Sequence, residues 1–170
     1  MDSTPLPQVS ERVLRVLERG KLARTDFTAF CEFVLGFTPA KHQLEWVRKL
    51  QEIGDNPRKK KVCIIAPRGA GKTQLVGVGF LAWMIGKNAA KHFGLLSYAD
   101  QVAWSRSAAI KKVIESSQAY HITFPEVRKS RYKWGDREFI LDRPDLKDPH
   151  PTLRAGGTES AVVAYRLNGL

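Results

Sequence analysis

Apolar residues recur every three to four positions through the first third of the sequence, which is the spacing of amphipathic helices. This spacing predicts helices over residues 10–20, 26–35 and 38–53. Ser10 and Thr38 stand at two of the predicted starts, where a hydroxyl caps a helix, and a glycine follows each segment as a helix end. The glycines are Gly20, Gly36 and Gly54, and the predicted buried face of the third helix comprises Leu44, Val47 and Leu50.

After residue 61 the pattern changes to strands alternating with helices. Residues 62–66 form a short apolar, β-branched run, which is typical of a buried parallel strand, and a helix is predicted over 72–85. A second strand is predicted over 92–98 and a second helix over 100–115, capped by Asp100. This order predicts an α/β fold with a mainly parallel sheet flanked by helices.

The last third of the sequence favours short strands. Residues 132–141 have aromatic and apolar strand character interrupted by Gly135–Asp136, which predicts a hairpin. Two further strands are predicted over 152–157 and 160–165.

The turn between the first predicted strand and its helix carries the most specific motif, Ala66-Pro67-Arg68-Gly69-Ala70-Gly71-Lys72-Thr73. A phosphate-binding loop requires this placement after a strand and before a helix. Gly69 and Gly71 allow the backbone N–H groups to turn toward phosphate oxygens, and the helix start adds the positive end of its dipole. Lys72 would neutralise phosphate charge and the Thr73 hydroxyl would bind Mg²⁺. The motif therefore predicts ATP and Mg²⁺ as cofactors, and the alternative is a glycine-rich turn without a ligand.

Charge adds a second expected partner. The sequence has 28 Lys and Arg residues against 17 Asp and Glu, a formal net charge of +11. A charge of this size predicts a polyanion, most often nucleic acid. Two basic runs, over 58–61 and 128–133, either hold DNA phosphates or form solvated loops. The two cysteines have no metal-site or disulfide spacing, and no membrane span is predicted, because the longest uncharged run, 73–86, is too short.

Several stretches together resemble the large terminase subunit of tailed phages. They are Phe37–Gln43, Pro67–Gly69 within the loop, Gly94–Arg106 and Arg154–Leu170. The resemblance covers residues 27–170 and implies a P-loop NTPase of the RecA-like class, preceded by a helical segment. It divides the chain into an N-terminal helical lead-in over 1–36 and a partial P-loop ATPase domain over 37–170.

The resemblance also implies a function and a set of partners. Terminases couple ATP hydrolysis to the translocation of double-stranded DNA into the prohead, in the host cytoplasm. The implied protein partners are the portal protein, the small terminase subunit and further copies of the chain in a ring.

The same resemblance assigns roles to individual residues. It gives Gln43 the contact with adenine, Lys72 a catalytic role and Arg166 an action on the nucleotide of a neighbouring subunit. Arg68 either stabilises charge on the transferred phosphoryl group, as an arginine finger does, or faces solvent. The predicted nucleotide-binding residues are Gln43, Ala66, Pro67, Arg68, Gly69, Ala70, Gly71, Lys72, Thr73 and Gln74.

A Walker B strand is the part of the family pattern that the sequence does not supply. Phe139–Asp142 imitates it, but Arg143 follows where a second acid belongs. No nuclease domain is found either, so we expect an incomplete motor that binds nucleotide weakly and hydrolyses little by itself. Two alternatives stay open: a fragment of a superfamily 2 helicase or restriction-type DNA translocase, and a non-catalytic remnant that binds DNA or a protein partner.

Overall fold

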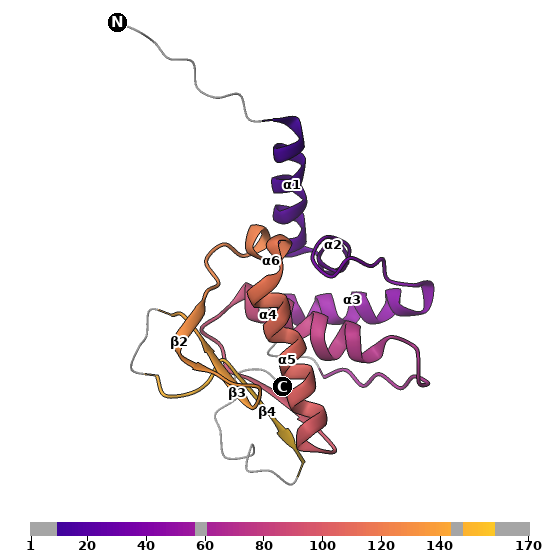
Figure 1. The fold of residues 1–170 in the computed structure, drawn as a ribbon. Helices are drawn as coiled ribbons and strands as arrows, with labels where there is room; N and C mark the ends of the chain where they lie inside the picture. Colours follow the sequence, from indigo (N-terminus) through magenta and orange to yellow (C-terminus); the bar gives the residue numbers. More distant parts are fainter. Residues whose placement is uncertain (1–9, 57–60, 144–147, 159–170) are drawn as a thin grey trace, which may run out of the picture.

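A computed structural model of the 170-residue chain describes residues 10–56, 61–143 and 148–158. Its helices are α1 (Glu11–Thr25), α2 (Phe27–Phe33), α3 (Lys41–Asp55), the π-helix η1 (Thr73–Phe80), α4 (Leu81–Lys87), α5 (Asp100–Ser116) and α6 (Gln118–Thr123). Its strands are β1 (Phe93–Ser97), β2 (Lys129–Trp134), β3 (Glu138–Leu141) and β4 (Leu153–Gly157). Figure 1 shows the helices stacked beside one small sheet, with α1 extending away from the rest.

The four strands form one sheet in the order β1-β4-β3-β2. Strands β1 and β4 are parallel, whereas β3 is antiparallel to both β4 and β2. The predicted α/β class is confirmed, but the prediction of a mainly parallel sheet is wrong for the part of the chain that the structure describes. The reason is the tight Gly135–Asp136 turn, which returns β3 beside β2 as the predicted hairpin instead of sending the chain through a crossover helix.

The predicted strand over 62–66 is extended but joins no ladder among the described residues. A β-branched run favours extended backbone, yet a strand also needs a hydrogen-bonding neighbour. Here the neighbouring element is the helix α3, whose backbone groups are paired internally. The apolar run therefore stays accessible, and the side chain of Ile65 is 92% exposed.

The remaining predicted elements of this region are present. Strand β1 and helix α5 fall where predicted, and β4 occupies the predicted 152–157 run. The predicted 72–85 helix is present as η1 continued by α4. The strand predicted over 160–165 lies outside the described residues.

Several predicted helix boundaries and caps are wrong, and contacts distant in sequence account for those at Gly20 and Asp100. Ser10 precedes α1, but its hydroxyl makes no cap hydrogen bond. Helix α1 continues through Gly20, which is buried against Ile122 of α6. Helix α3 begins after Ala40 rather than at Thr38, and Leu44 on its predicted inner face is 48% exposed. Asp100 does not cap its own helix: its Oδ1 accepts a 2.6 Å hydrogen bond from the N–H of Gly157 at the end of β4.

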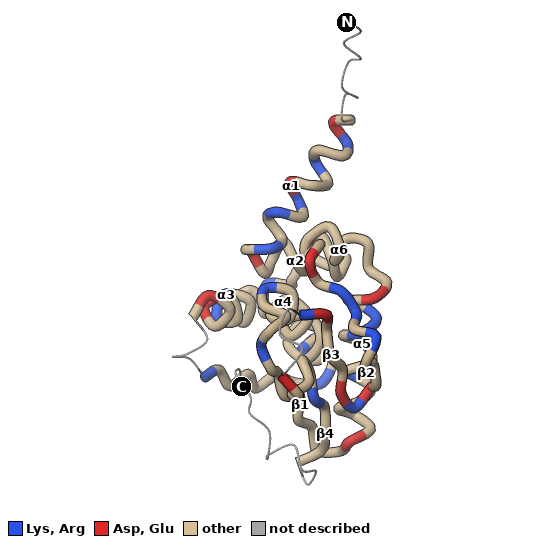
Figure 2. Tube along the Cα trace, turned by 90° about the vertical axis from the view of Figure 1, so that its left-hand side faces the viewer, with Lys and Arg blue, Asp and Glu red and all other residues tan. Residues whose placement is uncertain are grey.

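The helical part of the core is an aromatic cluster between α2, α4 and α6. Phe27 packs on Trp83 with ring centroids 5.2 Å apart, and Phe30 meets the edge of Tyr120 at 6.2 Å. The buried polar atoms of this cluster are satisfied, because Trp83 Nε1 donates to the Ala23 carbonyl at 3.0 Å and the Tyr120 hydroxyl to that of Ala82 at 3.0 Å. Helix α5 then joins the helical layer to the sheet, since it packs on η1 and on β1 and β4 (Figure 2).

The two cysteines have different environments. Cys31 is buried in the core, and burial raises the pKa of its thiol to about 12, so it stays in the unreactive thiol form. Cys63 is exposed, and both thiols are free. None of the helices in the described ranges has the length and apolar character needed to span a bilayer.

Two helical glycines offer a matched test of this packing. A Cβ at Gly86 would lie 2.3 Å from the ring of the fully buried Phe124, whereas one at Gly77 would meet nothing closer than 3.8 Å. We expect Gly86→Ala to lower the free energy of unfolding by about 1–3 kcal/mol through overpacking. Gly77→Ala should raise it by up to about 1 kcal/mol through helix propensity. Chemical denaturation measures both, and equal effects would contradict the close approach of α4 to Phe124.

Candidate phosphate-binding loop

The loop over residues 66–73 connects the extended 61–67 segment to η1. Gly69 has φ +83° and Gly71 φ +79°, the left-handed region that glycine adopts without strain. Among the described residues only Gly36 shares a positive φ, so the loop concentrates this unusual backbone. A Cβ at either position would strain the turn.

The loop presents several backbone donors together. The N–H groups of Arg68, Gly69, Ala70 and Gly71 have no acceptor among the described residues. The first regular helical bond comes only afterwards, from Leu75 N–H to the Gly71 carbonyl at 3.0 Å. Successive unpaired N–H groups ahead of a helix start are the donor arrangement that anions bind.

Lys72 provides the positive charge beside these donors. Its half-buried side chain folds back so that Nζ donates to the Ala66 carbonyl at 3.3 Å. Ala66 precedes the turn, so the ammonium group bridges the two ends of the loop. A neutral carbonyl is a weaker partner for an ammonium group than a phosphate oxygen, so an arriving phosphate can take over this hydrogen bond.

Helix α3 holds the loop from the side through Gln43. The amide of this buried side chain donates from Nε2 to the Ala70 carbonyl at 2.8 Å, while Oε1 accepts from the Ala40 N–H at 3.0 Å. A Cβ on Gly71 would lie 2.5 Å from Gln43 Nε2, so glycine is needed there for a second reason. The predicted adenine contact of Gln43 stays a prediction, because the structure places its amide on the loop itself.

A second α3 side chain reaches the same carbonyl, and the sequence did not single it out. His42 Nε2 lies 3.3 Å from the Ala70 oxygen, and its ring meets the edge of Trp46 with centroids 5.6 Å apart. The available signal was its position directly before Gln43. Together these two side chains fasten the N-terminal end of α3 to the loop.

The other predicted site residues among those described are more exposed to solvent. Thr73 and Gln74 are exposed at the start of η1, on the wall of a cavity of about 610 Å³. Apolar side chains of α5 and of the segment after α2 also line this cavity. Arg68 and Pro67 are exposed, and the Arg68 guanidinium has no partner among the described residues. Arg166 lies outside the described residues.

The described residues do not complete a magnesium site. Thr73 offers one hydroxyl, and no group of three or more His, Cys, Asp or Glu side chains within the described ranges is placed to hold a metal ion. Asp142, the Walker B imitation, is exposed at the end of the antiparallel hairpin strand β3, where its N–H donates to the Arg128 carbonyl at 2.8 Å. Asp142 thus follows a hairpin strand, and Arg143 stands beside it where a second acid would belong.

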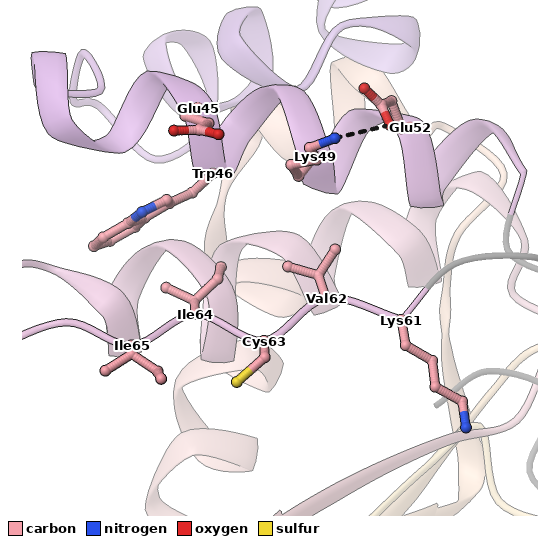
Figure 3. Close-up of a pocket in the computed structure, with 9 residues that line it drawn as sticks. All are labelled: Glu45, Trp46, Lys49, Glu52, Lys61, Val62, Cys63, Ile64 and Ile65. Atoms are coloured by element: carbon pink, nitrogen blue, oxygen red, sulfur yellow. Dashed lines mark ion pairs between the residues drawn. The ribbon is translucent and has the colours of Figure 1, made fainter.

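A larger cavity lies beside the loop but is a different feature. It has a volume of about 640 Å³ and separates α3 from the extended segment Lys61–Ile65 (Figure 3). Val62 and Ile64 point toward α3, whereas Cys63 and Ile65 point away from it. None of the loop residues 66–73 lines this cavity, so it is not the phosphate site.

The chain matches no protein-family model, no curated protein and no solved structure. The candidate site is therefore defined by its own residues. They are two left-handed glycines, the row of unpaired N–H groups, Lys72 at the helix start and the α3 side chains that hold the loop.

Proposed function

We propose that this chain is the ATP-binding portion of a viral DNA-packaging motor, a terminase large subunit. The observation that carries nucleotide binding is the loop with left-handed Gly69 and Gly71, unpaired N–H groups and Lys72 at the start of η1. The choice of DNA packaging depends on the sequence resemblance and on the net charge of +11.

Phosphate binding in this proposal uses contacts that the loop can exchange. The N–H groups of residues 68–71 take the phosphate oxygens, and the Lys72 ammonium leaves the Ala66 carbonyl for the anion. Because Gln43 and His42 both contact the Ala70 carbonyl, a movement of the loop would also displace the start of α3. Thr73 would supply one Mg²⁺ ligand, and the other ligands and the acid that activates water would come from groups outside the described residues.

Two alternatives share these observations. A superfamily 2 helicase or restriction-type translocase would use the same loop and the same glutamine. A non-catalytic remnant that binds DNA or a protein would keep the contact of Lys72 with the Ala66 carbonyl.

Removing the charge of Lys72 distinguishes the two ATP-binding proposals, terminase and helicase, from the non-catalytic remnant. We expect Lys72→Ala to weaken ATP binding by at least about tenfold, because a charge-assisted contact to phosphate is lost. Lys21→Ala on the exposed face of α1 is the matched control and should bind as the wild type does. Fluorescent-nucleotide titration measures both variants. An ATP affinity that is the same in Lys72→Ala as in the wild type would favour the non-catalytic remnant.

The same preparation tests the expected lack of turnover. Phosphate release by the chain alone should stay at background. Turnover that Lys72→Ala abolishes would show that the chain supplies its own catalytic acid and would contradict the incomplete-motor part of the proposal.

A glutamine substitution tests whether Gln43 holds the loop or reads the base. We expect Gln43→Ala to weaken ATP and GTP binding by the same factor, about five- to tenfold, because it removes one or two hydrogen bonds that shape the loop. Gln101→Ala, an exposed glutamine on α5, is the control. A loss confined to ATP in the titration would instead establish an adenine contact.

A further inference from the structure

Strand β2 exposes residues that a regular strand would bury. It is the edge strand of the sheet and pairs only with β3 among the described strands, with a register irregularity between Lys129 and Trp134. Within that irregularity Arg131, Tyr132 and Lys133 are all exposed in succession. Tyr132 is 84% exposed, so little of its apolar surface is removed from water within the described residues.

Basic groups surround this tyrosine. Arg128 and Arg131 have no carboxylate partner among the described residues. Lys129 pairs with Glu115 at 2.7 Å, and Lys133 pairs with Glu138, but both are surface pairs worth little free energy. Figure 2 shows the Lys and Arg stretches running along β2 and the adjoining α5. Such a surface attracts polyanions and disfavours an apolar protein partner.

Charge on an edge strand also prevents strand-to-strand aggregation. That role accounts for the lysines and arginines of β2. It does not account for Tyr132, because an exposed aromatic ring works against solubility.

Tyr132 forms one wall of a cavity of about 370 Å³, large enough for a nucleobase. The half-buried Ile140 of β3 supplies apolar surface, with the fully buried Leu141 beneath the cavity, and Ser130 and Asp142 supply polar atoms. Asp148 also borders the cavity, but its carboxylate is occupied by His92 at 2.8 Å and Arg143 at 3.4 Å. The Asp142 carboxylate has no partner among the described residues, so it remains as a hydrogen-bond acceptor.

We propose that this cavity and the edge of β2 bind single-stranded nucleic acid. One unstacked base lies against the Tyr132 ring, and Arg128 and Arg131 hold the neighbouring phosphates. Asp142 accepts from an exocyclic amino group, which favours cytosine over thymine because thymine has no such donor. The inference depends on the proposed function only for the class of polymer, and it requires no ATP.

Fluorescence anisotropy with labelled oligo(dC), oligo(dT) and a short duplex, without nucleotide, tests the site. We expect oligo(dC) to bind more tightly than oligo(dT) or the duplex. Tyr132→Ala should weaken oligo(dC) binding by about tenfold, the effect of losing one base–aromatic stack, and Tyr132→Phe should restore it. Arg131→Ala should lower the slope of log affinity against log salt by about 0.7, the value for one phosphate contact on a single strand.

Lys21→Ala is again the control for loss of a positive charge. Asp142→Asn should reduce the difference in affinity between oligo(dC) and oligo(dT). The proposal is overturned if Tyr132→Ala binds as the wild type does, if the duplex binds as tightly as oligo(dC), or if Lys21→Ala weakens binding as much as Arg131→Ala. Lys72→Ala should bind oligo(dC) normally. A chain that binds oligo(dC) through Tyr132 but binds no ATP would refute the proposed function and leave this inference intact.

Discussion

Trp83 is the side chain on which the arrangement of the helices depends. Its indole N–H is bonded to the Ala23 carbonyl of α1 at 3.0 Å, and its ring packs on Phe27 of α2. Its far edge also fills the place of a side chain at Gly54, where a Cβ would lie 2.3 Å away. One residue of α4 therefore sets the positions of α1, α2 and the C-terminal end of α3. Since η1 runs directly into α4, the same packing fixes the start of η1, where the candidate phosphate-binding loop ends.

The loop is thus held from both sides. Trp83 positions the C-terminal end of α3, and Gln43 ties the other end of that helix to the Ala70 carbonyl. Two fixed points restrain the loop that contains the left-handed Gly69 and Gly71. Preorganisation of this kind reduces the ordering cost that a ligand would otherwise meet.

The local spacing of apolar residues was sufficient to predict some helices and strands but not others. Helix α5 was predictable because its inner residues Ala103, Ser107, Ile110 and Ile114 follow helical spacing and are buried. The 62–66 run failed as a strand because strand formation depends on a neighbour, which a local pattern does not specify. The prediction that α1 ends at Gly20 was wrong because Gly20 packs against Ile122, 102 positions away, inside the helix.

The same distinction separates the parts of the two candidate sites. The glycines of the loop follow from the motif, since their φ values are local properties. The contact of Gln43 with Ala70, and the place of Tyr132 beside a cavity lined by β2, β3 and the segment after β3, arise from folding and have no local signature. Helix α5 contacts both regions: it packs on η1, and its Lys111 Nζ donates to the Trp134 carbonyl of β2 at 3.2 Å. If phosphate binding shifts η1, one helix would carry that shift to the proposed nucleic-acid surface. Coupling between the two proposed ligands would require α5 to have two positions of similar free energy.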